Sequence, residues 1–255
     1  MNKQSKIQWT FALWVVLLFS TPLLSATPVV SFLQANQNYV DGNYAEAERL
    51  YSHILDSGVE SAEIYFNLGN CYFRMGNYPQ AILNYERARR LDKHDPAIIT
   101  NLKITRTKLI DRFEELPDVF FVRWWKQFTG LMSYNSWAIL FLSLFFFCFC
   151  AIALYLTAAF YAVKIRSFYV AVALFVMSGI CFTSAVYEHA LLSKEIGIVS
   201  SNKVGIYSVP NNTNQKFTVN SGTKVEVLDK VGNYWQVRTS DGNSGWIDKT
   251  VLMII

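Results

Sequence analysis

The chain has 255 residues and a formal net charge of +4 at pH 7, and 52% of its residues are hydrophobic and 16% aromatic. This composition is too apolar for an ordinary soluble domain, and the length suffices for two or three compact units. Acidic and basic residues are mixed along the chain, whereas a nucleic-acid interface gathers positive charge. We therefore expect a multidomain membrane protein without a nucleic-acid partner.

The N-terminal residues 1–26 predict an export signal. Two lysines precede an apolar run, Ile7–Phe19, which is the pattern of the charged and apolar regions of a secretory signal. Ser25 and Ala26 offer a cleavage point, although Leu24 is bulkier than the residue usually required there. We expect a signal peptide that exports the following domain, and that stays as a membrane anchor if it is not cleaved.

A sequence repeat follows the signal. At one constant spacing, Gly42, Tyr44, Ala47 and Tyr51 recur as Gly76, Tyr78, Ala81 and Tyr85. A period of this length is typical of stacked helical repeats. The pattern predicts two helix pairs and then a capping helix over Asp95–Arg112, with Asn43 and Asn77 as helix N-caps.

The bulky and small residues of the second unit resemble the tetratricopeptide (TPR) motif, at Tyr65, Leu68, Gly69, Tyr72, Gly76, Tyr78, Ala81, Tyr85 and Ala88. The resemblance implies an all-α repeat domain over residues 27–112 whose first helices line a concave binding surface. By register, that surface carries Asn36, Tyr39, Asn67, Asn70, Phe73 and Arg74. We expect the amides to pair with the backbone of a bound peptide; in the alternative, these side chains are solvated or pack on a neighbouring helix.

Two of these residues, Asn36 and Asn67, match the asparagines of carboxylate-clamp TPR proteins. Cations complete the clamp in those proteins, whereas Phe32, Ala97 and Asn101 stand at the cation positions here. A free C-terminal carboxylate is therefore not the expected ligand.

Residues 113–136 form an aromatic and basic segment. Phe120, Phe121, Trp124 and Trp125 lie close to Arg123 and Lys126, a mixture that favours the lipid headgroup layer. The alternative is a buried corner of the repeat domain.

Two uncharged segments, 137–163 and 167–187, are each long enough to cross a bilayer, since about 20 apolar residues suffice. The basic turn between them, residues 164–166, predicts an antiparallel hairpin. We expect Trp124, Trp125, Lys164 and Arg166 at membrane interfaces. Because cations favour the cytoplasmic side, the turn should face the cytoplasm and both flanking domains the periplasm.

The last segment, residues 196–255, alternates apolar and polar residues as strands do. Strands are expected over Gly197–Ser200, Val204–Val209, Thr223–Leu228, Tyr234–Arg238 and Ser244–Ile247. Pro210, Gly222–Val225, Tyr234–Val237, Asp241-Gly242 and Gly245–Ile247 resemble the bacterial SH3 domain, which implies an all-β barrel. Tyr207, Tyr234 and Trp235 are candidates for an aromatic groove that binds peptide or glycan, with at least one of them in the core.

Catalytic residues are not apparent. His53, His94, His189 and Cys71 are the distinctive side chains of the exported parts, and none has motif spacing. We interpret Cys71 as a small core residue, and Glu188-His189 as either a proton-responsive pair or a simple interface anchor. The sequence predicts a non-enzymatic protein without a cofactor or metal.

The order of signal, repeats, aromatic segment, hairpin and SH3 barrel resembles the BatE family of the Bacteroides aerotolerance (Bat) operon. The resemblance implies a multi-pass cytoplasmic-membrane protein with periplasmic domains. It also implies partners, namely membrane-anchored von Willebrand A-type proteins and a MoxR-type ATPase in a stress-related complex. The leading hypothesis is a membrane-anchored scaffold; the alternative is a cell-wall-tethered sensor whose barrel binds peptidoglycan.

Overall fold

The structure is a computed structural model that describes residues 27–111, 119–210 and 214–255. It divides into two compact units, Met1–Leu109 and Ile110–Ile255, and each is described by itself below. The expected signal peptide and Leu116-Pro117 lie outside the described residues.

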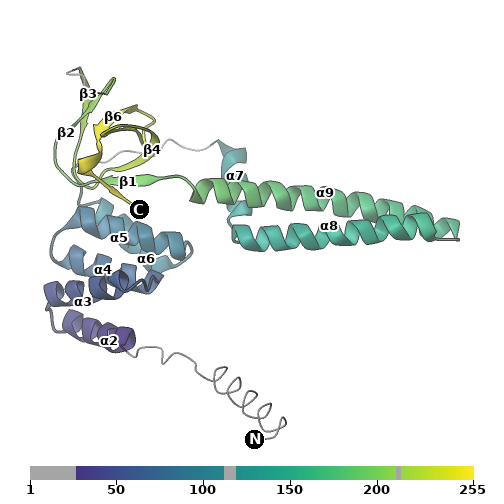
Figure 1. Cartoon of the computed structure of the whole chain (residues 1–255), viewed down its shortest axis with the longest axis horizontal. Coiled ribbons are helices and arrows are strands. Elements are labelled where there is room, and N and C mark those ends of the chain that lie inside the picture. Colours follow the sequence, from purple (N-terminus) through teal and green to yellow (C-terminus); the bar gives the residue numbers. More distant parts are fainter. Residues whose placement is uncertain (1–26, 112–118, 211–213) are drawn as a thin grey trace, which may run out of the picture. The chain divides into compact units, whose positions relative to one another are not determined.

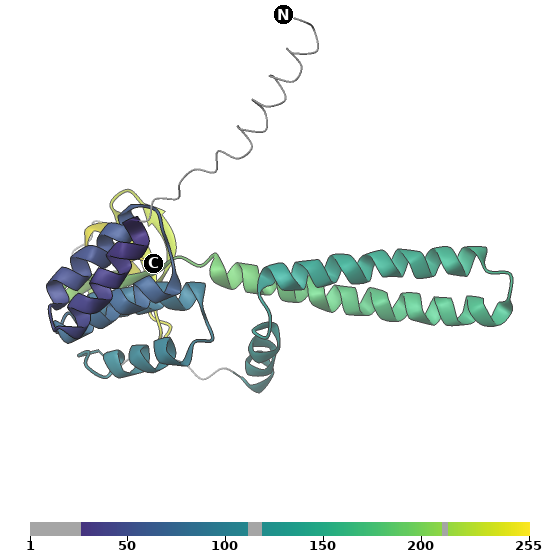
Figure 2. The same cartoon turned by 90° about the horizontal axis from the view of Figure 1, so that it is seen from below.

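The first unit consists of antiparallel helices joined by short turns (Figures 1 and 2). Its described helices are α2 (Thr27–Val40), α3 (Tyr44–Asp56), α4 (Ala62–Arg74), α5 (Tyr78–Leu91) and α6 (Pro96–Arg106). The turns after α2 and α4 place Gly42 and Gly76 at φ of 82° and 78°, a conformation that other residues adopt only at a cost. The repeated glycines therefore end the first helix of each pair.

The core of this unit lies between paired helices, and its buried members include Ala35, Ala47, Tyr51, Ile54, Ile64, Leu68 and Cys71. Cys71 is fully buried, and this burial, with the nearby Glu48 carboxylate, raises the pKa of its thiol to about 12. The thiol therefore stays protonated at neutral pH, as expected of a core residue.

Two details differ from the sequence prediction. The last helix ends at Arg106 rather than Arg112, because Thr107, Lys108 and Leu109 donate their backbone N–H groups three residues back, in tight turns. Asn43 stands at the start of α3 without a side-chain capping bond. Asn77 does cap α5, since its side chain accepts from the backbone N–H of Gln80 at 3.4 Å.

The second unit contains α7 (Phe120–Thr129), α8 (Tyr134–Thr157) and α9 (Tyr161–Leu192). α8 and α9 run antiparallel side by side in both views (Figures 1 and 2). Both are long and apolar enough to cross a membrane. Small residues face the contact between them, including Cys148, Ala151, Ala171, Ser178, Cys181 and Ser184, which lets the helices approach closely.

The turn of the hairpin lies at Ala158–Phe160, so the prediction of a basic turn over residues 164–166 was wrong. The expected first span, residues 137–163, held more residues than the roughly 20 needed to cross a bilayer, and the turn forms inside it. Lys164 and Arg166 consequently lie on the first turns of α9. Their long side chains can still reach a headgroup layer from there.

The C-terminal sheet has seven antiparallel strands in the order β3-β2-β6-β5-β4-β1-β7. Their bounds are β1 (Ile196–Val199), β2 (Val204–Tyr207), β3 (Gln215–Val219), β4 (Lys224–Val231), β5 (Tyr234–Thr239), β6 (Ser244–Asp248) and β7 (Leu252–Ile254), with the one-turn helix η1 at Lys249–Val251. The sequence prediction lacked β3 and β7, which are short and lie at the two ends of the strand order. Ile206, Val225, Val237 and Ile247 fill the core.

The first described residues of this unit are tied to the sheet. The carboxylate of Asp111 accepts hydrogen bonds from the backbone N–H and Nδ2 of Asn220, at 2.6 and 2.7 Å, and from the hydroxyl of Thr223 at 2.9 Å. Asn220 and Thr223 flank the turn between β3 and β4. These bonds hold Asp111, at the start of the second unit, on this turn.

A first prediction concerns Gly69, where a Cβ atom would lie 2.7 Å from the ring of Tyr85. Gly69→Leu should destabilise the first unit, since overpacking costs about 1–3 kcal/mol, even though leucine favours helix. We expect the buried Cys71 to react with a thiol reagent at least about tenfold faster, because about 1.4 kcal/mol corresponds to a factor of ten. Mass spectrometry can locate the label.

Ala45→Leu is the matched control, because Ala45 is exposed on α3 and the added side chain meets solvent. Equal labelling rates of Cys71 in the two variants would contradict the close packing of α4 on α5.

Candidate functional site

A hydrogen-bonded ladder of asparagines joins the first helices of the repeats. Asn36 Oδ1 on α2 accepts from the hydroxyl of Tyr51 and, at 3.4 Å, from Nδ2 of Asn67 on α4. One repeat later, Asn70 Oδ1 accepts from the hydroxyl of Tyr85 at 2.7 Å and from Nδ2 of Asn101 on α6 at 2.8 Å. The same arrangement of one tyrosine and two asparagines therefore occurs twice, at the period of the sequence repeat.

In both repeats, the ladder leaves polar atoms of the asparagines available to a ligand. Within the described residues, Nδ2 of Asn36 and Asn70 and Oδ1 of Asn67 and Asn101 make no hydrogen bond to the chain. None of these atoms is among the buried unpaired ones, so they reach solvent. An extended peptide presents N–H and C=O groups alternately, and amide donors and acceptors in a row match that pattern.

The structure contains features of both alternatives for this surface, namely amides that can bind a peptide and side chains that pack on a neighbouring helix. Asn36, Asn67 and Asn70 contact neighbouring helices and still present one polar atom each. Asn101 belongs to the ladder as well, although the sequence reasoning considered it only as a missing clamp cation. Its spacing from Asn67 equals the period of the repeat, and this is the signal that could have identified it.

Aromatic and cationic side chains lie at the turn end of α2 and α4. The Arg74 guanidinium sits 4.9 Å from the centre of the Tyr44 ring, and Tyr39 packs edge-on against the same ring. Phe73 packs on Tyr78 one repeat later. Tyr39, Phe73 and Arg74 are therefore held by the second helices, and Arg74 remains exposed.

A second candidate surface is the face of α7. Successive helical residues are about 100° apart, which puts Phe120, Phe121, Trp124, Trp125 and Phe128 on one side and Arg123, Lys126 and Gln127 on the other. The exposed fractions of Phe120, Phe121 and Trp124 are 81%, 60% and 62%. An apolar face this open marks a lipid or protein contact.

Contacts with the hairpin hold α7 in place. The indole N–H of Trp137 on α8 donates to the carbonyl oxygen of Thr129 at 2.8 Å, and the ring of Trp125 meets Tyr187 of α9 edge-on. Trp137 and Tyr187 lie at the end of the hairpin opposite its turn. Trp124 and Trp125 therefore lie at one end of the hairpin, and Lys164 and Arg166 at the other.

The Glu188-His189 pair lies near the same end as α7. Glu188 is buried on α9, and the His189 ring packs edge-on against Tyr134. The Ser193 hydroxyl lies 3.5 Å from His189 Nδ1, and the described residues hold no group of His, Cys, Asp and Glu side chains that could bind a metal ion. This placement is compatible with an interface anchor.

The barrel carries a third surface, on the outer side of its sheet. Tyr207 on β2 and Gln236 on β5 both pair with Trp246 on β6, and partners across strands share a face. Tyr234 alternates with the core residues of β5 and lies on the outer face too. The sequence reasoning did not include Trp246 in this surface, although Trp246 alternates along the strand with the apolar positions Gly245 and Ile247 and should therefore lie on the opposite face.

Trp235 does not belong to this surface. It shares the face of Val237 and packs against the core, and Lys230 Nζ covers its ring at 4.6 Å from the centre. The expectation that one of the three aromatics is core therefore applies to Trp235, and the outer surface consists of Tyr207, Tyr234 and Trp246.

The two tyrosines of the ladder predict how the stability of the first unit depends on pH. Burial raises the pKa of Tyr51 and of Tyr85 above the ordinary value near 10. Below pH 10 both tyrosines contribute fully to the free energy of unfolding of the first unit. Above pH 10 this contribution is lost, and each tyrosine lowers the free energy of unfolding by up to about 1.4 kcal/mol per pH unit. We expect the labelling of Cys71, normalised to an unstructured thiol, to accelerate between pH 10 and about pH 11.

Tyr51→Phe combined with Tyr85→Phe should flatten this alkaline response, while costing about 0.5–1.5 kcal/mol per lost hydrogen bond at neutral pH. Tyr78→Phe is the control, since the Tyr78 hydroxyl makes no hydrogen bond within the described residues. An unchanged alkaline slope in the double variant would count against the ladder.

The aromatic face of α7 predicts which of its residues enter a lipid bilayer. In a chain with its four cysteines replaced, a spin label at Phe121→Cys should be more accessible to oxygen than to a water-soluble nickel complex in lipid nanodiscs. A label at Gln127→Cys should show the reverse, because apolar faces of interfacial helices enter the headgroup boundary. Equal accessibilities would show that the aromatic face contacts something other than lipid.

The comparisons with known proteins agree with this architecture. Residues 62–95 match the family model of the tetratricopeptide repeat, and residues 206–252 match that of the bacterial SH3 domain. No curated protein matches the chain. The chain therefore contains a tetratricopeptide repeat and a bacterial SH3 domain, and two helices between them are apolar enough to span a membrane.

Proposed function

We propose that the protein is a non-enzymatic, membrane-anchored scaffold whose repeat unit binds an extended segment of a partner protein. The asparagine ladder carries this proposal, because it presents solvent-facing amide groups at the period of the repeat. Tetratricopeptide and SH3 domains both serve protein–protein interaction, which supports the same proposal.

The hairpin would fix this binding event at a membrane. With Lys164 and Arg166 near its turn, the positive-inside tendency favours a cytoplasmic turn. A hairpin returns the chain to the side it left, so both soluble domains would then share the periplasm. Two binding domains in one compartment raise the effective concentration of a second contact with the same partner.

The order of domains favours a partner of a particular kind. It resembles that of BatE proteins, and on this basis we propose membrane-anchored von Willebrand A-type proteins of a Bat/MoxR-type stress complex as partners. Their anchoring in the same membrane would present segments at the level of the repeat unit.

A second candidate function rests on the outer face of the barrel. Tyr207 and Trp246 pair across strands there and are partly exposed, and the accessible face of an aromatic ring can stack on a sugar ring as well as on a peptide. A peptidoglycan contact through this face would make the protein a cell-wall-tethered sensor.

Peptide selection tests the scaffold. A random peptide library displayed on phage is selected against the detergent-solubilised full chain, and the binding constants of the selected peptides are measured. Asn67→Ala combined with Arg74→Ala should weaken them about tenfold or more, because hydrogen bonds to neutral and charged groups contribute about 0.5–3 kcal/mol each. Arg49→Ala, an exposed change on α3, should leave them unchanged.

If the selected peptides bind the Asn67→Ala, Arg74→Ala variant as tightly as the Arg49→Ala variant, the ladder surface is excluded as the binding site. If no peptide is selected and the chain sediments with purified sacculi, with sedimentation lost in Trp246→Ala, the tethered sensor replaces the scaffold.

A further inference from the structure

Helix α4 carries a stripe of four polar side chains, Glu63, Asn67, Asn70 and Arg74, on the ladder side of the repeat unit. Asn67 and Asn70 belong to the ladder, and the exposed Glu63 and Arg74 lie one turn before and one turn after them. Positions that are three or four residues apart share one face of a helix. All four side chains therefore lie at the surface where the ladder presents its amides.

Two tyrosines near the ladder locate the charges of the stripe. Burial raises the pKa of Tyr51, and the Glu63 carboxylate adds to this rise. Burial also raises the pKa of Tyr39, and the Arg74 guanidinium opposes that rise. Because the interaction of two charges weakens with distance, Glu63 lies near Tyr51 of the ladder, and Arg74 lies near Tyr39 on the adjacent helix α2.

The stripe has one electrostatic polarity along its whole length. Asn67, the neighbour of Glu63, has Oδ1 available to a ligand, whereas Asn70, the neighbour of Arg74, has Nδ2 available. The half of the stripe near Glu63 thus presents acceptors, and the half near Arg74 presents donors. A complementary ligand has donors and positive charge at one end, and acceptors and negative charge at the other.

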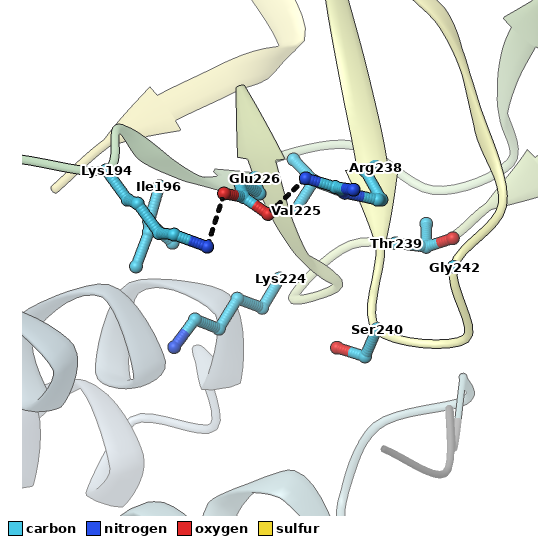
Figure 3. A pocket seen from close by; sticks show the side chains of 9 residues that line it. All are labelled: Lys194, Ile196, Lys224, Val225, Glu226, Arg238, Thr239, Ser240 and Gly242. Atoms are coloured by element: carbon cyan, nitrogen blue, oxygen red, sulfur yellow. Dashed lines mark hydrogen bonds and ion pairs between the residues drawn. The ribbon is translucent and has the colours of Figure 1, made fainter. Parts of the chain in front are cut away.

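The two charges of the stripe, Glu63 and Arg74, have no ionic partner within the described residues. The charges beside the end of α9 differ in this respect. There, the Glu226 carboxylate lies between Lys194 Nζ at 2.8 Å and Arg238 Nη2 at 3.0 Å (Figure 3). The charges of α4 are therefore available to a partner protein, whereas Glu226 already binds cations of its own chain.

The length of the stripe sets a spacing for the ligand. Glu63 and Arg74 are eleven residues apart, which corresponds to about 16 Å along a helix axis. An extended peptide advances about 3.3 Å per residue, so about five of its residues cover this distance. A segment that lies along the stripe can therefore place one charged side chain at each end.

The equivalent positions of α2, one repeat period earlier, are mostly aliphatic. Val29, Leu33 and Val40 occupy three of them, and the exposed fractions of these side chains are 66%, 62% and 77%. Exposed apolar side chains that gather at one place mark a contact surface. We therefore expect aliphatic residues between the two charges of the ligand, in contact with α2.

We propose that the repeat unit selects partner segments that carry a basic and an acidic residue about five residues apart, with aliphatic residues between them. The basic side chain binds Glu63, the acidic side chain binds Arg74, and the ladder amides bind the backbone between them. This inference rests on the scaffold function proposed above, and it names the class of segment that the scaffold binds.

Peptides selected from the random library on the detergent-solubilised full chain test the inference. Their sequences should be enriched in a basic and an acidic residue at this spacing. One selected peptide is then made in two further forms, with glutamine in place of its acidic residue or in place of its basic residue. Fluorescence anisotropy measures the binding constants of the three peptides for the wild-type chain, for Glu63→Gln and for Arg74→Gln.

Replacing the acidic residue of the peptide should weaken binding to the wild-type chain roughly two- to fivefold, as for an exposed ion pair. It should have no effect on Arg74→Gln, which lacks the partner charge. The basic residue should behave in the same way with Glu63→Gln. Arg49→Gln and Asp56→Asn, exposed changes on α3, are the controls and should retain the full effect of both replacements.

Equal losses on the wild-type chain and on the two variants would overturn the inference, since Glu63 and Arg74 would then only complement the dipole of α4. Selected peptides without the charge pair would overturn it too. In both cases Asn67→Ala decides on the scaffold. If this change weakens the peptides, only the inference is refuted; if it does not, or if no peptide is selected, the scaffold is refuted as well.

Discussion

The repeat unit depends on one interaction, the hydrogen bond from a buried tyrosine hydroxyl to an asparagine of the preceding helix. Tyr51 and Tyr85 are each 1% exposed, so their hydroxyl groups must find partners inside the protein. Asn36 and Asn70 provide them and accept a second bond from the next repeat. The same contact therefore closes each helix pair and stacks one repeat on the next.

The ladder also explains why a binding surface can persist on a short array. An asparagine that supports the stack through Oδ1 is held in one orientation, and its Nδ2 group is then presented without further loss of side-chain freedom. The buried Glu86 of α5 adds to the stack, since its carboxylate forms ion pairs with Arg89 at 2.7 Å and, across to α6, with Arg106 at 2.8 Å. A preorganised surface loses less entropy on binding, which suits a scaffold.

The hairpin and the barrel are joined by a different kind of constraint. Aromatic and backbone contacts connect α7 to α8 and α9, and ion pairs connect the end of α9 to the barrel. Both sets of contacts lie at the end of the hairpin that is opposite its turn. If that end meets the headgroup layer, the aromatic face of α7 would contact the leaflet on that side through its apolar side chains.

Local patterns in the sequence were enough to assign the class of each domain. The constant spacing of Gly42 and Gly76 indicated helical repeats, the uncharged segments indicated two long apolar helices, and the alternation after Ile196 indicated strands, because each pattern depends on local periodicity. Cys71 could be assigned to the core on the same grounds. Other features became visible only in the folded chain, namely the partners of Asn36 and Asn70, the hairpin turn at Ala158–Phe160, the core place of Trp235 and the gathering of Lys194 with Arg238. These features depend on which residues meet across helices and strands. The repeat period relates equivalent positions, such as Asn67 and Asn101, but a local pattern does not specify which side chains are in contact.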